Sequence, residues 1–393
     1  MKNILVIGFS TRNIVCSGSK AGYNMYAIDA FCDHDLMRFA TDARRLDING
    51  SFDASAVSLD ELAGMVLSFG VEFDAIIPGS GFEMLDLEGL PYRVLSNDPG
   101  IMRDASDKYC FSKLMGKMDM PHPKTVLLPD INELGFPVIV KPACSGGGIF
   151  NMKLESDDDV NVLHKRLQDV GMPPGKNKLI AQEYVEGVPA SVSVVSTKDE
   201  ALAIAVNEQL IGTPWLTDSP FAYCGNITPY EIPCASEMAD MSERIILELG
   251  LVGSSGVDFI ISEDGPVVIE VNARFQGSLD TVEAATGINL LAAHLQAFEG
   301  TMVAGKDGRG TDDRMKYACR AVLYADRDIR MTGDVQKELL QLDVCDVPNT
   351  GQAIGPGEPV ISVLSSGKCR EDVLSRVKES VMFIRETLNL LDS

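Results

Sequence analysis

Three side chains with oxygen ligands, followed by an arginine, stand close together in the second half of the chain. Asp258 belongs to the segment GVDFIIS, and Glu270, Asn272 and Arg274 belong to the segment VVIEVNAR. Apolar residues alternate with polar ones in both segments, and this period of two is typical of β-strands. Oxygen ligands on one hairpin face suit Mg²⁺, which binds carboxylates together with substrate phosphates. An ordinary solvated hairpin face explains these residues equally well.

The register of the predicted hairpin decides whether the two carboxylates meet. A two-residue Asp-Gly turn sets Asp258 opposite an apolar residue. A three-residue loop over 263–265 pairs it with Glu270 and pairs Phe259 with Ile269. A slip of one residue turns every side chain to the other face, so the apolar pattern favours the three-residue loop. Opposed carboxylates repel each other, and a bound cation removes that cost.

The composition excludes several classes of function. Asp and Glu number 57 against 34 Lys and Arg, a formal net charge of −23, whereas binding to nucleic acid phosphates requires a basic surface. The nine cysteines form no CxxC pair, so we expect reduced thiols. The N-terminus MKNILVIG lacks the form of a signal peptide, and no apolar run approaches the ~18 residues of a membrane span. We therefore expect a cytoplasmic protein without nucleic acid or membrane partners.

The first ninety-odd residues have the pattern of a parallel β/α layer. Strands are predicted at the apolar runs 3–8, 25–29, 73–78 and 93–96. Helices are expected to begin at Arg12 and after the capping box that Ser58 opens. Strands that alternate with helices indicate a parallel sheet. The loop GFSTR lacks the GxGxxG fingerprint, which disfavours a dehydrogenase.

Two loops of this layer carry the candidate substrate contacts. They follow the first and third predicted strands, at the sheet edge where open α/β sheets bind ligands. The candidates are Ser10, Arg12, Ser80 and Glu83. Arg12 can pair with a carboxylate and Glu83 with an ammonium group, so an amino-acid-like substrate is expected. A plain turn is the alternative for each loop.

The middle of the chain carries lysines and glycines in a pattern that suits phosphates. A predicted helix that begins at Asp104 or Ser106 holds Lys108, and the predicted strand FPVIVKP holds Lys141 near its end. The glycine-rich segment CSGGG follows, and its backbone N–H groups can fold over phosphates. It is not a Walker A loop, because the lysine precedes the glycines. A flexible hairpin tip is the alternative.

These motifs occur in a characteristic order: the lysine helix, the strand lysine with its glycine loop, QEYVEG, Asp258, and the set Glu270-x-Asn272-x-Arg274. Over roughly residues 98–300 the chain therefore resembles the ATP-grasp superfamily. The passages GFSTR, GSGFE and EVNARFQGSLD are similar to predicted ATP-dependent carboligases related to the pyrrolysine-pathway ligase. The passage GQAIGPGEPVISVLSSG is similar to the C-terminal domain of biotin carboxylase.

The resemblance implies an α/β protein whose core is α+β. Residues 1–98 would form a parallel-sheet pre-ATP-grasp domain. Residues 99–300 would form the ATP-grasp domain from two α+β subdomains, with the lid subdomain at about 113–181. Residues 301–393 would form a small α+β module. Its polar residues, such as Arg320 and Ser362, either line the active site or, as we favour, have a packing role.

The resemblance also implies nucleotide contacts. Phosphate contacts are implied for Lys108 and Lys141. The lid loop would consist of Ser145, Gly146, Gly147 and Gly148. The adenine hinge would consist of Gln182, Glu183, Tyr184 and Val185. Glu186 is the candidate for the ribose, because Pro189 stands where many ATP-grasp enzymes have an acid.

The remaining implied roles are catalytic. One or two Mg²⁺ ions, with Mn²⁺ as the alternative metal, would be held by Asp258, Glu270 and Asn272. Arg274, with Lys141, would stabilise the transferred phosphoryl group. These roles fit a carboxylate–amine ligase that forms an acyl phosphate from ATP and releases ADP and phosphate. Its partners would be a small carboxylate and an amine, and a homodimer is left open. The alternatives are a carboxylase-type enzyme that uses bicarbonate through carboxyphosphate, and a non-catalytic ATP-binding module.

Overall fold

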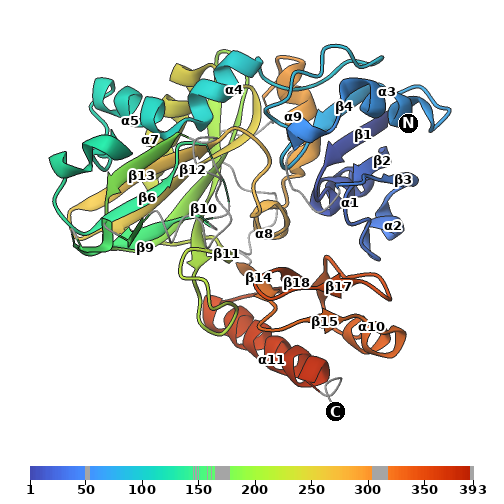
Figure 1. Ribbon diagram of the computed structural model, residues 1–393. Helices are drawn as coiled ribbons and strands as arrows, with labels where there is room; N and C mark the ends of the chain where they lie inside the picture. Colours follow the sequence, from blue (N-terminus) through green and yellow to red (C-terminus); the bar gives the residue numbers. More distant parts are fainter. Residues whose placement is uncertain are drawn as a thin grey trace.

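The computed structural model describes residues 1–48, 54–144, 146, 148, 150–156, 158–160, 162–163, 178–302 and 317–389. Figure 1 shows an N-terminal layer in blue, a central region in green and yellow, and C-terminal strands and helices in orange and red. None of the helices in these residues combines the length and apolar character needed to cross a membrane. The mixed α/β fold class that the sequence predicts is confirmed.

The N-terminal layer is a parallel sheet. Its strand order is β3 (Asp42–Arg45), β2 (Asn24–Asp29), β1 (Asn3–Gly8) and β4 (Ala75–Pro78). Its helices are α1 (Arg12–Lys20), α2 (Leu36–Phe39) and α3 (Leu59–Leu67), with a 3₁₀ turn at Ala54–Ala56. Ser58 caps α3 by accepting a hydrogen bond from the N–H of Glu61, as predicted. The fourth predicted strand is wrong: only Val94 forms a bridge there, to Ile76.

The loops after β1 and β4 are held against each other. The N–H of Phe9 donates to the Ser80 carbonyl at 2.9 Å. Gly81 has φ +88°, and a Cβ there would overlap the ring of Phe9. Phe82 is fully buried and packs edge to face on Phe9, with ring centroids 5.3 Å apart. These contacts fix the backbone of the loop from which the side chain of Glu83 projects.

An eight-stranded sheet forms the centre of the molecule (Figure 1). Its order is β13 (Gly265–Asn272), β12 (Gly253–Ser262), β9 (Val188–Ser196), β10 (Ala201–Ile211), β11 (Tyr223–Thr228), β14 (Tyr317–Tyr324), β18 (Pro359–Gly367) and β16 (Val344–Cys345). The helices around it are α7 (Ala235–Leu249), α8 (Leu279–Thr286), α9 (Leu290–Phe298), α10 (Gly333–Leu339) and α11 (Arg370–Asn389). A short pair joins β15 (Ile329–Arg330) to β17 (Ala353–Ile354). Because β11 pairs with β14, the sheet continues into the C-terminal residues.

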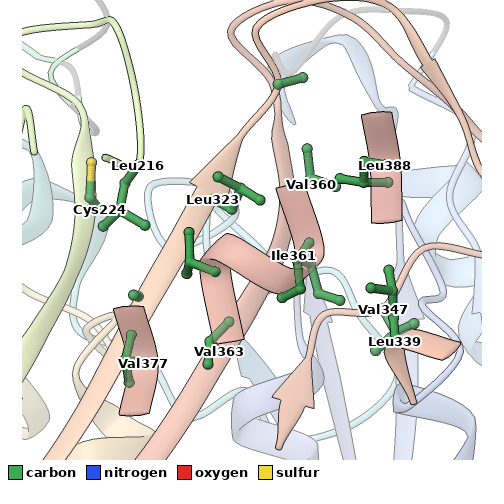
Figure 2. Packing of buried hydrophobic residues seen from close by; sticks show 14 of the residues in the cluster. Leu216, Cys224, Leu323, Leu339, Val347, Val360, Ile361, Val363, Val377 and Leu388 are labelled. Atoms are coloured by element: carbon green, nitrogen blue, oxygen red, sulfur yellow. The ribbon is translucent and has the colours of Figure 1, made fainter. Parts of the chain in front are cut away.

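A hydrophobic cluster ties those C-terminal residues to the central sheet. Leu216 and Cys224 come from β11 and the segment before it, whereas Val360, Val377 and Leu388 come from β18 and α11. Figure 2 shows these side chains within one packed cluster. Burial of apolar surface therefore couples the last strands and helix to the sheet that carries the hairpin.

A smaller four-stranded sheet precedes the central one in sequence. Its order is β5 (Thr125–Leu127), β8 (Leu179–Glu183), β6 (Val138–Pro142) and β7 (Met152–Leu154). Before it come α4 (Pro99–Ser106), α5 (Lys108–Lys117) and a 3₁₀ segment at Leu128–Glu133. The predicted lysine helix is present as α5, but its predicted start at Asp104 or Ser106 is wrong. The carboxylate of Asp107 caps α5, and Lys108 is the first residue of that helix.

The β12–β13 hairpin has the predicted pairing at Asp258 and Glu270 but not at its turn. Asp258 pairs with Glu270, as predicted. The turn, however, is a two-residue Glu263-Asp264 turn, and Phe259 pairs with Val268 instead of Ile269. A β-bulge at Ile269 shifts the register by one residue and brings the two carboxylates opposite each other.

Candidate active site

A cavity of about 490 Å³ lies along the β12–β13 hairpin. One part of its wall, the hinge end, includes Ile139, Lys141, Gly148, Gln182, Glu183, Tyr184 and Val185. Another part, the loop end, includes Ser10, Asn13, Ser80, Gln276, Arg320 and Asp346. The hairpin contributes Asp258, Glu270, Asn272 and Arg274 to the same cavity. The cavity thus collects residues from the N-terminal layer, the central sheets and the C-terminal strands.

Asp258 is held by amide groups. The Nδ2 of Asn272 donates to its Oδ2 at 2.9 Å, and the Nε2 of Gln209 donates to its Oδ1 at 3.1 Å. Burial and the facing carboxylate of Glu270 raise the pKa of Asp258 to about 7. Without a cation, the pair therefore resists carrying two negative charges near neutral pH.

Two buried lysines stand beside Glu270. The Nζ of Lys108 lies 2.9 Å from the Oε2 of Glu270. Burial alone raises the pKa of Glu270, but the ammonium groups of Lys108 and Lys141 outweigh it and hold that pKa below its ordinary value. Burial lowers the pKa of Lys141 to about 8. The structure therefore brings both predicted phosphate lysines to the predicted metal ligands, although only Lys141 lines the cavity itself.

Arg274 is fixed on three sides. Its Nε lies 2.9 Å from the Oε1 of Glu83. Its Nη1 donates to the carbonyl of Phe275 at 3.1 Å, and its Nη2 donates to the Oδ1 of Asn272 at 3.3 Å. A guanidinium held in this way is preorganised toward the cavity. Glu83, predicted as a substrate contact, lies behind Arg274 and pairs with it.

The hinge residues 182–185 line the cavity as a group. Gln182 is 4% exposed, and its Nε2 donates to Thr125. The Glu183 carboxylate accepts the N–H of Lys124 at 2.9 Å, so its side chain supports the neighbouring strand. Glu186, the ribose candidate, is outside the cavity lining.

The predicted lid loop is described only in part. Gly148 lines the cavity, and a Cβ at Gly146 would lie 3.7 Å from the Nη2 of Arg274. Both glycines therefore lie near the hairpin residues. Ser145 and Gly147 lie outside the described residues.

Arg12 does not reach the cavity wall. It is 2% exposed and lies between Asp280, at 2.8 and 2.9 Å, and Asp346, at 2.9 Å. It therefore binds carboxylates of the protein itself. By contrast, Ser10 and Ser80 line the loop end, and their role as substrate contacts stays a prediction.

Several cavity residues, among them Gln276 and Asp346, were not anticipated as site residues. Arg320, for which packing was favoured over a place at the active site, lines the loop end with Asp346. The Nε2 of Gln276 lies 3.5 Å from the Oδ1 of Asp258. A signal for Gln276 was its place two residues after Arg274. Arg320 and Asp346 are brought in by the pairing of distant strands, which no local pattern in the sequence reveals.

Comparison with known proteins relates the chain to one domain family. Residues 105–278 match the family model of the ATP-grasp domain, and the chain has the ATP-grasp fold. An uncharacterised protein of Methanocaldococcus jannaschii is 26% identical over 95% of this chain and 91% of its own length.

Solved structures share this architecture over nearly the whole chain. The biotin carboxylase domain of 2-oxoglutarate carboxylase from Hydrogenobacter thermophilus, a dimer in complex with MgADP, ADP and bicarbonate, has a TM-score of 0.72 and 16% identity. The match covers 96% of this chain and 89% of that one. An L-amino acid ligase from Bacillus licheniformis has a TM-score of 0.69 and 15% identity, with 98% and 97% covered. At such identities the likeness establishes the fold alone.

Proposed function

We propose that the protein is an ATP-dependent carboxylate–amine ligase that acts through an acyl phosphate. The observation that carries this proposal is the joint position of Asp258, Glu270, Asn272 and Arg274 in one cavity, with Lys141 and the hinge residues at the hinge end. Adenine would lie at the hinge end, and the acid and the amine would enter at the loop end.

The hairpin residues fit a divalent cation. Asp258 and Glu270 face each other, and burial together with the repulsion between the two carboxylates raises the pKa of Asp258. Within the described residues, no three His, Cys, Asp or Glu side chains gather as a metal site. Two carboxylates and the amide oxygen of Asn272 would therefore need phosphate oxygens to complete a shell, as is usual for Mg²⁺. The bound metal would neutralise part of the phosphate charge.

Two displacements would follow at the γ-phosphate and the acyl carbon. A carboxylate oxygen of the acid attacks the γ-phosphorus, the bond to the β–γ bridging oxygen breaks, and ADP leaves. The amine nitrogen then attacks the acyl carbon, phosphate leaves, and the nitrogen loses its proton to solvent. Arg274 and Lys141 would stabilise negative charge on the transferred phosphoryl group, while Asn272 and Glu83 keep the guanidinium of Arg274 in place.

A carboxylase-type reaction with bicarbonate remains the second candidate. It is supported by the fold that the chain shares with a biotin carboxylase domain solved with bicarbonate. Two finer assignments complete the proposal, a cytoplasmic location and a homodimer. Sedimentation or size exclusion with light scattering would test the homodimer.

The proposal is tested by the products formed from MgATP. The purified protein is incubated with pools of carboxylic acids, with bicarbonate alone, or with no acid, in the presence of hydroxylamine. We expect ADP, phosphate and a hydroxamate that depends on the acid. AMP and pyrophosphate would indicate adenylation instead, ADP with bicarbonate alone would favour the carboxylase, and no turnover with any pool would leave only nucleotide binding.

A further inference from the structure

The charge at the loop end restricts which acids can bind there. Arg320 is the arginine of this wall, and its Nη2 lies 2.6 Å from the Oδ2 of Asp346. The other oxygen of Asp346 lies 2.9 Å from the Nε of Arg12. Arg12 is also bound by Asp280, and Arg274 by Glu83. Every arginine at or directly behind this wall in the described residues is thus matched by a carboxylate of the protein.

The balance of charge is slightly negative. Three guanidinium groups carry a charge of +3 and four carboxylates carry −4, so the net charge is −1. The guanidinium groups belong to Arg12, Arg274 and Arg320, and the carboxylates belong to Glu83, Asp35, Asp280 and Asp346. Burial and the neighbouring Asp346 raise the pKa of Asp35. If Asp35 is left out, three carboxylates still balance the three guanidinium groups. Burial disfavours the charged form of Asp346, yet Arg12 and Arg320 outweigh this and hold its pKa well below the usual range. Asp346 therefore stays ionised.

Acceptor oxygens also exceed donors beside Arg274. The Oε1 of Glu83 binds the guanidinium, but its Oε2 is buried without a hydrogen-bond partner in the part of the chain that the structure describes. The side chain of Asp346 is 19% exposed and belongs to the cavity wall. A carboxylate can accept about four hydrogen bonds, so Asp346 can take a further donor from the cavity.

We infer that the acid activated in this cavity carries an ammonium group, which pairs with Asp346 while the carboxylate of the acid lies at Arg274. This inference rests on the proposed function and narrows its substrate to zwitterionic, amino-acid-like acids. A phosphate ester or bicarbonate would add negative charge to a wall without a surplus of cations, next to the phosphates of ATP. An ammonium group supplies the missing positive charge and the missing hydrogen-bond donor.

Matched pairs of acids test the inference. ADP release from MgATP and hydroxylamine is measured with each protein amino acid and with the same acid lacking its α-amino group, for example alanine against propionate. Bicarbonate and O-phospho-L-serine are further probes. We expect at least one amino acid to exceed its des-amino partner by about tenfold or more in kcat/KM. Equal values for the two members of the active pair, or activity confined to bicarbonate or the phosphate ester, would overturn the inference while the ATP chemistry stood. The absence of ADP release with every probe would instead refute the ligase itself.

Variants locate the ammonium contact. Asp346→Asn is expected to raise KM for the active amino acid about tenfold, with KM for ATP unchanged, and to reduce the preference over the des-amino acid. Asp33→Asn is the matched control, because burial raises the pKa of Asp33 to about 8 and the amide then replaces a neutral carboxyl. If Asp346→Asn does not fold, the matched pairs of acids measured on the wild-type protein still test the inference. Unchanged discrimination in folded Asp346→Asn would contradict the assignment.

Discussion

Asp258 and Glu270 face each other in one cavity yet have opposite pKa shifts. Burial and the neighbouring carboxylate raise the pKa of Asp258 to about 7, whereas Lys108 and Lys141 lower that of Glu270. The lysines thus keep Glu270 ionised, whereas Asp258 is the carboxylate whose ionised form a bound cation would favour. This asymmetry belongs to individual side chains, and it explains why each is expected to respond differently to substitution.

Glu270→Gln is expected to reduce acid-dependent ADP release by about 10²–10³-fold, because a charged ligand beside the transferred phosphoryl group is lost. The change keeps the shape of the side chain but leaves the buried ammonium group of Lys108 without its ionised partner, so the unfolding free energy is expected to fall by about 1–3 kcal/mol. Steady-state ADP release and urea unfolding measure the two effects. A variant that turns over ATP at the wild-type rate would contradict the metal site. Glu263→Gln, in the exposed turn of the same hairpin, is the control.

The residue pattern predicted that Asp258 and Glu270 oppose each other, and the family resemblance pointed to Lys108 and Lys141, which lie beside them. Arg12, however, was misplaced. A loop arginine after a strand suits a substrate carboxylate as well as a protein carboxylate. The choice between them depends on Asp280 and Asp346, which are more than 260 positions away in the sequence. No local pattern contains that information. The cavity position of Arg320 likewise depends on the pairing of β14 with β11, which no local pattern reveals.

Individual elements show a similar limit. Alternation in β12 and β13 indicated strands whose carboxylates oppose each other, and they do. The predicted three-residue loop was one way to reach that register, but the chain uses a two-residue turn and a bulge at Ile269. Both routes shift the pairing by one residue, so the apolar pattern cannot distinguish them. The boundary between α4 and α5 at Asp107 was missed for a related reason. A polar residue such as Asp can cap a new helix or continue an existing one, so its type does not decide between the two.

Gly81→Ala tests the element that carries Ser80 and Glu83. The added Cβ overlaps Phe9, and φ is +88°, so we expect a loss of about 1–3 kcal/mol in the unfolding free energy and a lower kcat through displacement of Glu83. Gly70→Ala is the control, since Gly70 also has positive φ (+67°) but open space around its Cβ position. Equal losses in both variants would mean that the contact with Phe9 has no part in fixing the loop.

The packing of α9 on β12 predicts a pH-dependent stability. His294 lies between Phe275 and Phe298, with ring centroids at 4.7 and 4.9 Å, and burial lowers its pKa to about 4. The unfolded chain binds a proton as pH falls through about 6.5, but the folded protein binds it only near pH 4. Stability that is present above pH 6.5 is therefore lost as pH falls, by up to about 3 kcal/mol.

Urea unfolding between pH 4.5 and 7.5 measures this contribution as the difference between the wild type and His294→Gln. In His294→Gln, the unfolding free energy should lose the part of its pH dependence that His294 supplies, whereas His122→Gln should retain that part. Parallel pH profiles for the wild type and His294→Gln would show that the buried imidazole does not titrate as described.

At the scale of the whole molecule, one sheet connects residues on both sides of the domain boundary that was predicted at about residue 300. β14 pairs with β11, and the apolar cluster of Figure 2 crosses the same junction. The sequence predicted a small α+β module over residues 301–393. It did not show that β14 pairs with β11, because antiparallel pairing between distant strands leaves no local signal.

Truncation after residue 302 tests this connection. Removal of β14 leaves the backbone groups of Gly225–Thr228 without their pairing partners and exposes Leu216 and Ile227. We expect the fragment to aggregate or to lack cooperative unfolding, since open apolar edges favour association. Circular dichroism and thermal unfolding with and without MgATP report the outcome. A monomeric fragment that unfolds cooperatively and is stabilised by MgATP would show that residues 301–393 are an independent module.

Transfer of oxygen from the acid to phosphate tests the central proposal most directly. The active acid is labelled with ¹⁸O in both carboxyl oxygens and incubated with MgATP and an amine acceptor. An acyl phosphate predicts that one ¹⁸O appears in inorganic phosphate and one remains in the amide, alongside ADP. Unlabelled phosphate formed with ADP, or ¹⁸O found in AMP, would contradict it.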